Sequence, residues 1–309
     1  MHLPLPPHQA KARHEWGYSL IELLVAMGVL TIVSGTALSG LLNLTKTHLT
    51  VSNRTEMHSG VRNATELLQQ EVGQAGRVVL PATVSLGGGV AAGNATVAVT
   101  SVSGMFVGEQ LVVDTGANEE TVTLSGVNTS NNQITAAFAI AHAIGAPVNV
   151  YGGFAAGVVP TNTANGSTGT VMKLFGDVNS NGQMVYIEYS CDTTTGNLYR
   201  RSMAYNAATK PAVTADMALL NNVVANPDGT PCFTYQQQTA NGTTFVVDVA
   251  ITLTVQTPDK DPVTGLYQRE TKALLNVSPR NVFNVWQLAG LGISNRVQPT
   301  PPSVTALLP

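Results

Sequence analysis

The chain is poor in charged and aromatic residues: of its 309 residues, 11% are Asp, Glu, Lys or Arg and 6% are aromatic. The formal net charge is −3 and no block of basic residues occurs, so no nucleic-acid partner is expected. We interpret the single basic doublet, Arg200-Arg201, as solvated surface. Small, polar and β-branched residues dominate instead, which favours a β-rich extracellular protein with many turns over a cytosolic helical enzyme.

Residues that build catalytic or zinc sites are also scarce. His142 is the only histidine after His58, and it lies in an alanine-rich turn. A Ser-His-Asp or Cys-His site would depend on His142, and no nucleophile elbow stands beside it. One histidine and two widely separated cysteines do not support a zinc site. The sequence therefore predicts that the protein is not an enzyme and needs no cofactor.

Proline is missing between Pro7 and Pro81, so nothing forces a break in a helix over this stretch. Residues 23–42 form an apolar run without charge, long enough to cross a membrane. Apolar residues then recur at steps of three and four, which is typical of a helix with one buried face. These residues are Met57, Val61, Ala64, Leu68, Val72 and Ala75.

The two patterns together predict one helix from Tyr18 to about Gly76, whose segment 18–42 is transmembrane and whose second half is amphipathic. We assign residues 18–80 to this stalk. The charged residues of the second half, Glu71 among them, fall mainly off the apolar stripe.

Glu22 stands alone at the head of the apolar run. A carboxylate within a membrane span costs roughly 3 kcal/mol, so it should have a partner and a purpose. The segment before it, residues 1–17, is basic but has no apolar core of its own, unlike an ordinary secretory signal. The alternative is a plain N-terminal anchor, in which Glu22 reaches back to the membrane surface.

The residues GYSLIELLVAMGVLTIVSG resemble the class III signal of type IV prepilins and pseudopilins. In that family a prepilin peptidase, which is also an N-methyltransferase, cuts after the glycine and methylates the new N-terminus. The resemblance implies a leader at residues 1–17 and cleavage between Gly17 and Tyr18. It also makes Glu22 the glutamate that sets the axial register during assembly. Tyr18 stands where the family usually has phenylalanine.

Residues 81–155 differ from the stalk in composition, because they contain no lysine or arginine. Short β-favouring runs alternate with turns there, which predicts a small all-β module inserted after the stalk. The expected strands are residues 95–102, 110–114, 120–127, 133–137 and 147–151. The phrases GMFVGEQLVVDTGANEETVTLSGV and AHAIGAPVNV also resemble a repeat-type β module of bacterial surface and phage-associated proteins.

A second β region follows in residues 156–290. The expected strands are residues 171–175, 184–190, 197–204, 244–256 and 269–277, with a hairpin loop at residues 258–265. In order and spacing, LLQQEVGQAGRV, FGDVNSNGQMVYIEYSC, LYRR and LLNVSPRN resemble the PilW/PulJ-type minor pilins. That resemblance implies a pilin-like antiparallel β head. The proline-rich tail, residues 291–309, is predicted to be disordered.

Two further sets of residues are candidate sites. If the head is exported, Cys191 and Cys232 could form one disulfide in an oxidising compartment, and two buried thiols are the alternative. The segment after residue 176 fits a calcium-loop pattern, although a plain Asn/Gly turn explains it without a metal. The calcium ligands would be Asp177, Asn179, Asn181, Gln183 and Glu188.

The predicted fold class is α+β: a long N-terminal helix packed on an antiparallel β-sheet head, with an inserted all-β module. The expected function is that of a minor pilin that primes or joins a type IV pilus. A tip pseudopilin of type II secretion and a pilus-displayed adhesin that uses the β module are the alternatives. Its partners would be the prepilin peptidase, other major and minor pilins, and the bacterial cytoplasmic membrane before assembly.

Overall fold

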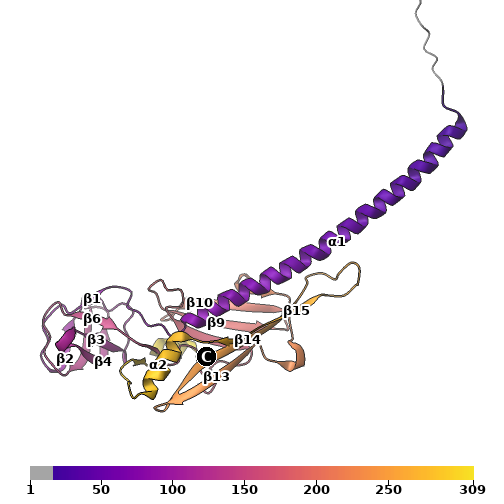
Figure 1. The fold of residues 1–309 in the computed structure, drawn as a ribbon. Helices are drawn as coiled ribbons and strands as arrows, with labels where there is room; N and C mark the ends of the chain where they lie inside the picture. Colours follow the sequence, from indigo (N-terminus) through magenta and orange to yellow (C-terminus); the bar gives the residue numbers. More distant parts are fainter. Residues whose placement is uncertain (1–16) are drawn as a thin grey trace, which may run out of the picture.

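The structure, a computed structural model, describes residues 17–309, so the predicted leader lies outside the described residues except for Gly17. One long helix, α1 (Leu20–Gln74), projects from a body built mostly of antiparallel strands (Figure 1). The α+β class is therefore observed, with one very long helix and separate sheets.

α1 has 55 residues, which makes it about 80 Å long at 1.5 Å per residue. Its start and end agree with the sequence prediction to within two residues. The chain leaves the helix at Gly76, whose φ of +81° favours glycine. A Cβ atom on Gly76 would also lie 2.9 Å from the Val282 side chain and 3.1 Å from the Phe154 carbonyl oxygen. A side chain at this position would therefore disturb the helix exit.

The two halves of α1 have opposite surroundings. Every residue from 17 to 49 is exposed, including the whole apolar run. α1 is the one helix among residues 17–309 that is long and apolar enough to cross a membrane. The buried residues of α1 all lie in its second half: Met57, Val61, Ala64, Thr65, Leu68, Glu71 and Val72. The predicted apolar stripe is confirmed.

The second half of α1 packs on two sheets of the body and shares one hydrophobic core with them. The first sheet has the strand order β11-β10-β9-β8, and in the second β14 pairs with β12, β13 and β15. All these pairs are antiparallel. The strands are β8 (Val171–Gly176), β9 (Val185–Asp192), β10 (Asn197–Ala204), β11 (Ala218–Asn221), β12 (Val223–Val224), β13 (Phe233–Ala240), β14 (Thr243–Gln256) and β15 (Arg269–Val277).

Five of these strands match the predicted ones closely, namely β8, β9, β10, β14 and β15. β13 was not predicted, because its sequence FTYQQQTA carries three consecutive glutamines. Its buried residue Phe233 enters the core shared with α1, and its pairing with β14 supplies the rest of its support. Tertiary pairing thus makes a strand from a segment of weak β propensity.

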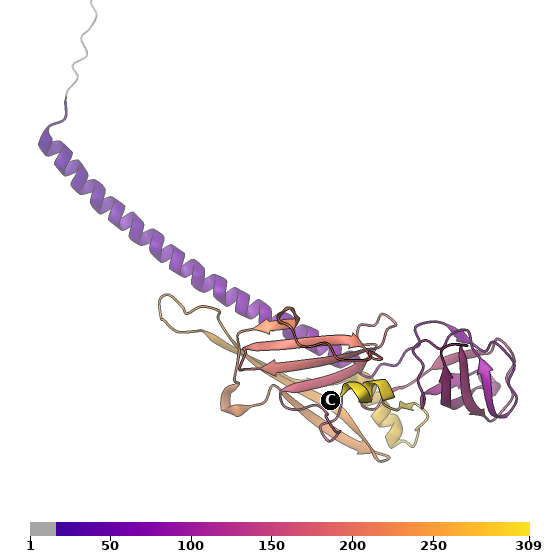
Figure 2. The ribbon, with the colours of Figure 1, turned by 180° about the vertical axis from the view of Figure 1, so that it is seen from behind.

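A third sheet has six strands in the order β1-β6-β3-β4-β5-β2 and a hydrophobic core of its own. Figures 1 and 2 both place it at the end of the molecule opposite to the N-terminus of α1. Four predicted strands agree closely with β3 to β6, and β2 starts and ends earlier than expected. The strands are β1 (Val84–Ser85), β2 (Gly93–Ala98), β3 (Gln110–Val113), β4 (Glu120–Asn128), β5 (Gln133–Phe138) and β6 (Pro147–Val150).

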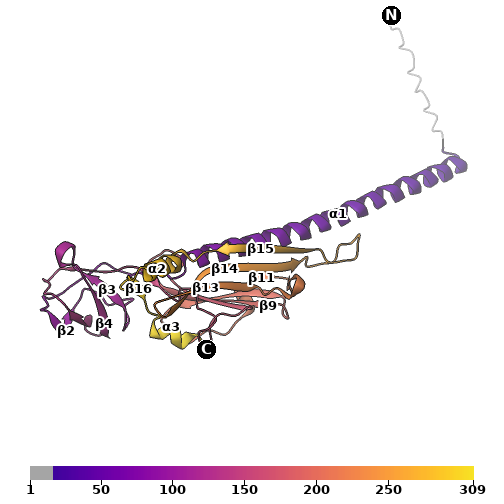
Figure 3. The ribbon, with the colours of Figure 1, turned by 60° about the horizontal axis from the view of Figure 1, so that its bottom comes forward.

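The C-terminal residues are ordered, so the prediction of a disordered tail over residues 291–309 is wrong. β16 (Val297–Gln298) pairs in parallel with β7 (Gly153–Phe154). The helix α3 (Pro302–Leu307) starts at its proline, a residue that suits the first turn of a helix. It buries Val304 and Leu307 in the cluster that contains Phe175 and Tyr186. α3 lies on the side of the β9 sheet away from α1 (Figure 3).

One further helix and three short turns complete the fold. α2 (Arg280–Gly290) follows β15 and was not predicted. Its buried residues Val282, Val285 and Ala289 pack with Phe245 and Val247 of β14. The 3-10 turns are η1 (Gly116–Asn118), η2 (Ala215–Met217) and η3 (Pro227–Gly229).

Candidate functional site

The predicted processing residues lie just before α1, and the predicted assembly residue, Glu22, lies in its first turn. Gly17 and Tyr18 are exposed and precede the helix, so the predicted cleavage bond lies in non-helical chain. Ser19 is the N-cap: its Oγ accepts a hydrogen bond from the Glu22 amide at 3.2 Å. In return, the Glu22 carboxylate accepts one from the Ser19 amide at 3.3 Å. This capping box satisfies two backbone amides that the helix would otherwise leave free.

The capping box turns the Glu22 carboxylate back towards the start of the chain. It contacts the amide one residue after Tyr18, so a terminal amine on Tyr18 would lie close to this acid. The remainder of the apolar run carries no other charge before Lys46. Glu22 is therefore the one acid on a long, exposed apolar surface of the kind that needs a membrane or a partner to cover it.

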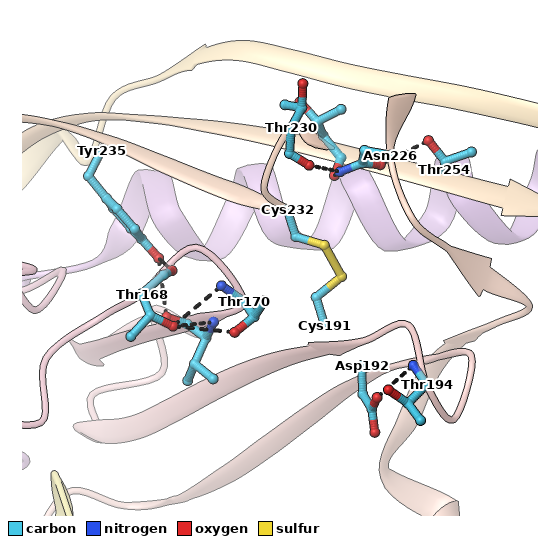
Figure 4. Close-up of a disulfide and its surroundings, with 12 residues drawn as sticks. Thr168, Thr170, Cys191, Asp192, Thr194, Asn226, Thr230, Cys232, Tyr235 and Thr254 are labelled. Atoms are coloured by element: carbon cyan, nitrogen blue, oxygen red, sulfur yellow. Dashed lines mark hydrogen bonds between the residues drawn. A yellow bond between two sulfur atoms is a disulfide. The ribbon is translucent and has the colours of Figure 1, made fainter. Parts of the chain in front are cut away.

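The predicted disulfide is present. Cys191, near the end of β9, is joined to Cys232, which directly precedes β13, with an S–S distance of 2.03 Å (Figure 4). The two Cα atoms are 6.5 Å apart and 41 residues separate the cysteines. Both cysteines belong to the core beneath α1. The bridge therefore ties the two sheets that support the helix to each other.

The structure does not bring the five predicted calcium ligands together. Asp177 accepts hydrogen bonds from the amides of Asn181 and Gly182, as in an ordinary Asn/Gly-rich turn. Glu188 pairs with Lys173 across the hairpin, whereas the hairpin ends at the pair Gly176–Val185. Three residues of strand separate Glu188 from that end, or about 10 Å. Calcium needs its ligands at about 2.5 Å, so Glu188 as a ligand of this loop is wrong.

Glu188 lies instead in a buried cluster of three cations. Arg201 and Lys210 donate to its carboxylate, Lys210 at 2.5 Å, and the Lys173 ammonium is 3.5 Å away. Burial by itself would raise the pKa of Glu188, but hydrogen bonds from Lys210, Tyr186 and Arg201 outweigh burial and lower it. Lys173 also donates to the Leu308 carbonyl at 2.5 Å, which holds the end of α3 against this cluster.

A second buried acid, Glu71, joins α1 to the body. The Tyr189 hydroxyl donates to it, and Arg200 donates from Nη2 at 2.6 Å. Burial and the adjacent carboxylate raise the pKa of Tyr189, so its hydroxyl keeps its proton. Because both residues of the doublet form ion pairs with buried acids, the interpretation of Arg200-Arg201 as solvated surface is wrong.

His142, the histidine considered for catalysis, lies between two acids of the six-stranded sheet. Its Nδ1 is 3.2 Å from Asp114 and its Nε2 is 2.6 Å from Glu120. The Glu120 carboxylate also accepts from the amides of Ala139 and Ile140. The His142 side chain is fully buried, so this arrangement holds the segment after β5 against the sheet.

No group of three or more His, Cys, Asp or Glu residues that could hold a metal ion occurs in residues 17–309. Comparisons with protein-family models, with curated proteins and with solved structures find no match for this chain. A function must therefore be argued from the residues and surroundings of α1 and from the arrangement of the body.

Proposed function

We propose that this protein is a minor pilin that enters or primes a type IV pilus through α1. The observation that carries the proposal is Glu22: one acid in the first turn of a helix half that is apolar and exposed throughout. The other half of the same helix is fixed in the body by its apolar stripe and by Glu71. Such a helix can leave a membrane and pack among similar helices without unfolding the body.

The proposed assembly step pairs two charges in a region of low dielectric. Cleavage after Gly17 would leave a protonated amine on Tyr18, and Glu22 of a neighbouring subunit would neutralise it. An unpaired charge in such surroundings is costly, so the pair favours the one axial position at which both charges meet. Before assembly, the same carboxylate is held by the capping box of its own helix.

Two substitutions separate the proposed ion pair from the capping box. Glu22→Ala removes the charge and the hydrogen bond to the Ser19 amide, whereas Glu22→Gln removes the charge alone, since glutamine also serves in a capping box. We expect both variants to insert in the membrane and both to be absent from sheared filaments. The matched control, Ser19→Ala, weakens the helix start by about 1 kcal/mol and should still enter filaments.

The readout is immunoblotting of membrane and filament fractions, with N-terminal mass spectrometry of the membrane form. We expect cleavage after Gly17 and methylation of Tyr18 in the wild type. Normal filament entry of Glu22→Gln would leave Glu22 with a helix-capping role alone. A native chain that keeps residues 1–17 would contradict the prepilin assignment itself. Loss of pili or loss of secretion in a deletion strain separates a pilus subunit from a secretion pseudopilin.

The position of the six-stranded sheet favours a second role, the display of a binding surface. This sheet has its own core and lies at the end of the molecule farthest from the exposed half of α1 (Figure 1). A subunit anchored by α1 would therefore carry this sheet away from the membrane. An adhesive function would reside there, beside the assembly function of the helix.

A further inference from the structure

The loop between β14 and β15, residues 257–268, extends from the body back along α1 towards its apolar half. Figures 1 and 3 show this course from two directions. At the base of the loop, the Glu270 carboxylate contacts the His58 ring of α1. Nearer the tip, the pKa of Asp261 is lowered mainly by hydrogen bonds from the amides of Thr264 and Val263, and in smaller part by the Thr50 hydroxyl of α1. Eight helical residues separate these two contacts, so the loop follows α1 for about 12 Å.

The tip of the loop presents apolar side chains to the outside. Val263 is 75% exposed, Leu266 68% and Tyr267 42%. Of the two acids in the loop, Asp259 is exposed beside Lys260, whereas Asp261 is turned inward: it is 6% exposed and accepts from the amides of Val263 and Thr264 at 2.8 and 2.9 Å. Lys260 places its ammonium 5.7 Å from the centre of the Tyr267 ring. The outer surface of the tip thus combines aliphatic groups, a tyrosine and a cation.

The height of the tip along α1 coincides with the surface of a membrane. The predicted transmembrane segment ends at residue 42 and Lys46 is the first charged residue after Glu22, so Lys46 would lie in the head-group layer, just outside the hydrocarbon. Thr50 lies four residues further on, or about 6 Å. The polar head-group layer on each side of a bilayer is roughly 5 to 7 Å thick. The exposed apolar surface of α1 also continues to Leu49 and Val51, at the same level as the loop.

We propose that Val263, Leu266 and Tyr267 insert in the head-group layer of the bilayer that α1 spans, as a second membrane contact of the unassembled subunit. Tyrosine and lysine are suited to this layer, because each has an apolar part and a polar end. Two contacts, helix and loop, restrict the rotation of the body about the axis of α1. The inference rests on the membrane-anchored state of the proposed function but not on filament assembly.

A lipid surface fits this tip better than a protein partner does. A stable protein interface buries about 800 Å² on each side, and three side chains on one loop cannot supply that area. A contact with lipid needs no minimum buried area here, because α1 already holds the loop at the membrane surface and makes the contact intramolecular in effect. Insertion of the tip is continuous with insertion of the helix beside it.

The experiment uses the full chain in vesicles of phosphatidylethanolamine and phosphatidylglycerol that contain nitroxide-labelled lipids. Because Cys191 and Cys232 form a disulfide, a single added cysteine accepts a fluorescent label. We expect the label on Thr264→Cys to lose fluorescence to the nitroxides, as does a label on Thr47→Cys in α1. A label on Asp228→Cys, at an exposed turn of the body, should keep its fluorescence.

A second variant distinguishes insertion of the loop tip in the bilayer from mere closeness of the tip to the bilayer. With Val263→Asp and Leu266→Asp added, the Thr264 label should regain its fluorescence while the Thr47 label stays quenched. Quenching at Thr264 that survives these substitutions would overturn insertion through the apolar tip.

Without these substitutions, an unquenched Thr264 label beside a quenched Thr47 label would overturn the loop contact and leave the membrane anchor. Two unquenched labels would overturn the membrane anchor as well. If the environment of the Thr264 label changed only at high protein density, the tip would contact a second copy of the chain, and the proposal of a lipid contact would be rejected.

Discussion

Glu109 is a buried acid at the junction between the six-stranded sheet and the rest of the body. It is fully buried, and the amide of Phe106 donates to its Oε2 at 3.3 Å. Its Oε1 has no hydrogen-bond partner among the described residues. Burial therefore raises the pKa of Glu109 to about 8, so the side chain is mostly protonated at neutral pH.

Glu109 should make the stability of the protein depend on pH. The ordinary pKa of the carboxyl is 4.5, so the unfolded chain loses this proton well before the folded chain does. The effect of Glu109 on the free energy of unfolding therefore favours the folded state most below pH 4.5, and this effect is lost as pH rises to about 8. We expect Glu109→Gln to be more stable than the wild type at pH 9 by on the order of a few kcal/mol. Urea unfolding of the full chain in detergent at several pH values measures the difference.

The matched control for this prediction is Glu119→Gln in the same sheet domain. Glu119 is exposed and lies 3.6 Å from Arg296. Its substitution should leave the alkaline loss of stability in place. Parallel pH profiles for the wild type and Glu109→Gln would show that the buried acid does not cause the loss.

At the scale of elements, the disulfide connects the two sheets that support α1. β9 belongs to one sheet and β13 to the other, and Cys191 and Cys232 lie at their ends. The bridge closes a loop in the unfolded chain, and this restriction favours the folded state. The docking of the helix depends on both sheets, so the bridge also supports α1.

Replacement of both cysteines by serine should lower the free energy of unfolding by about 4 kcal/mol, given the loop length and the chain-entropy relation. The urea midpoint of Cys191→Ser/Cys232→Ser, compared with the wild type, measures this change. A reducing agent should bring the wild type to the level of the double variant and leave the variant unchanged. Equal midpoints under oxidising conditions would contradict the prediction.

Most strands could be predicted because their β-favouring runs stop at clear turns, as at β10 and β15. α1 was predictable from two local patterns, an apolar run and a stripe of period three to four. The ion pair between Glu71 and Arg200 was not, since 129 residues separate the partners. Helical period alone placed Glu71 off the buried stripe. A carboxylate can be buried there because tyrosine and arginine of neighbouring strands reach it.

At the scale of the whole molecule, the six-stranded sheet is close to an independent unit. Its core is distinct from the core beneath α1. The chain enters it after Arg77 and returns at Gly153, and these two residues form an antiparallel bridge. Entry and exit thus lie side by side, so a short connection could replace the whole sheet.

Replacement of residues 81–151 by a short Gly-Ser linker should leave the rest of the protein folded. We expect the variant to retain its disulfide and its entry into filaments, and to lose adhesion if the sheet binds a surface. Non-reducing electrophoresis, circular dichroism and filament fractionation test these outcomes. Degradation of the variant or loss of its disulfide would show that the two parts fold as one unit.

Sequence alone determined the features that depend on neighbours along the chain. The length of α1, its uncharged run with Glu22 at the head, and most strand limits follow from local composition and period. Tertiary structure decided what depends on distant partners: the order of the C-terminal residues around Val304, the burial of Glu71, and the cations around Glu188. Local patterns cannot reveal such partners, because burial and charge pairing arise only when remote segments meet.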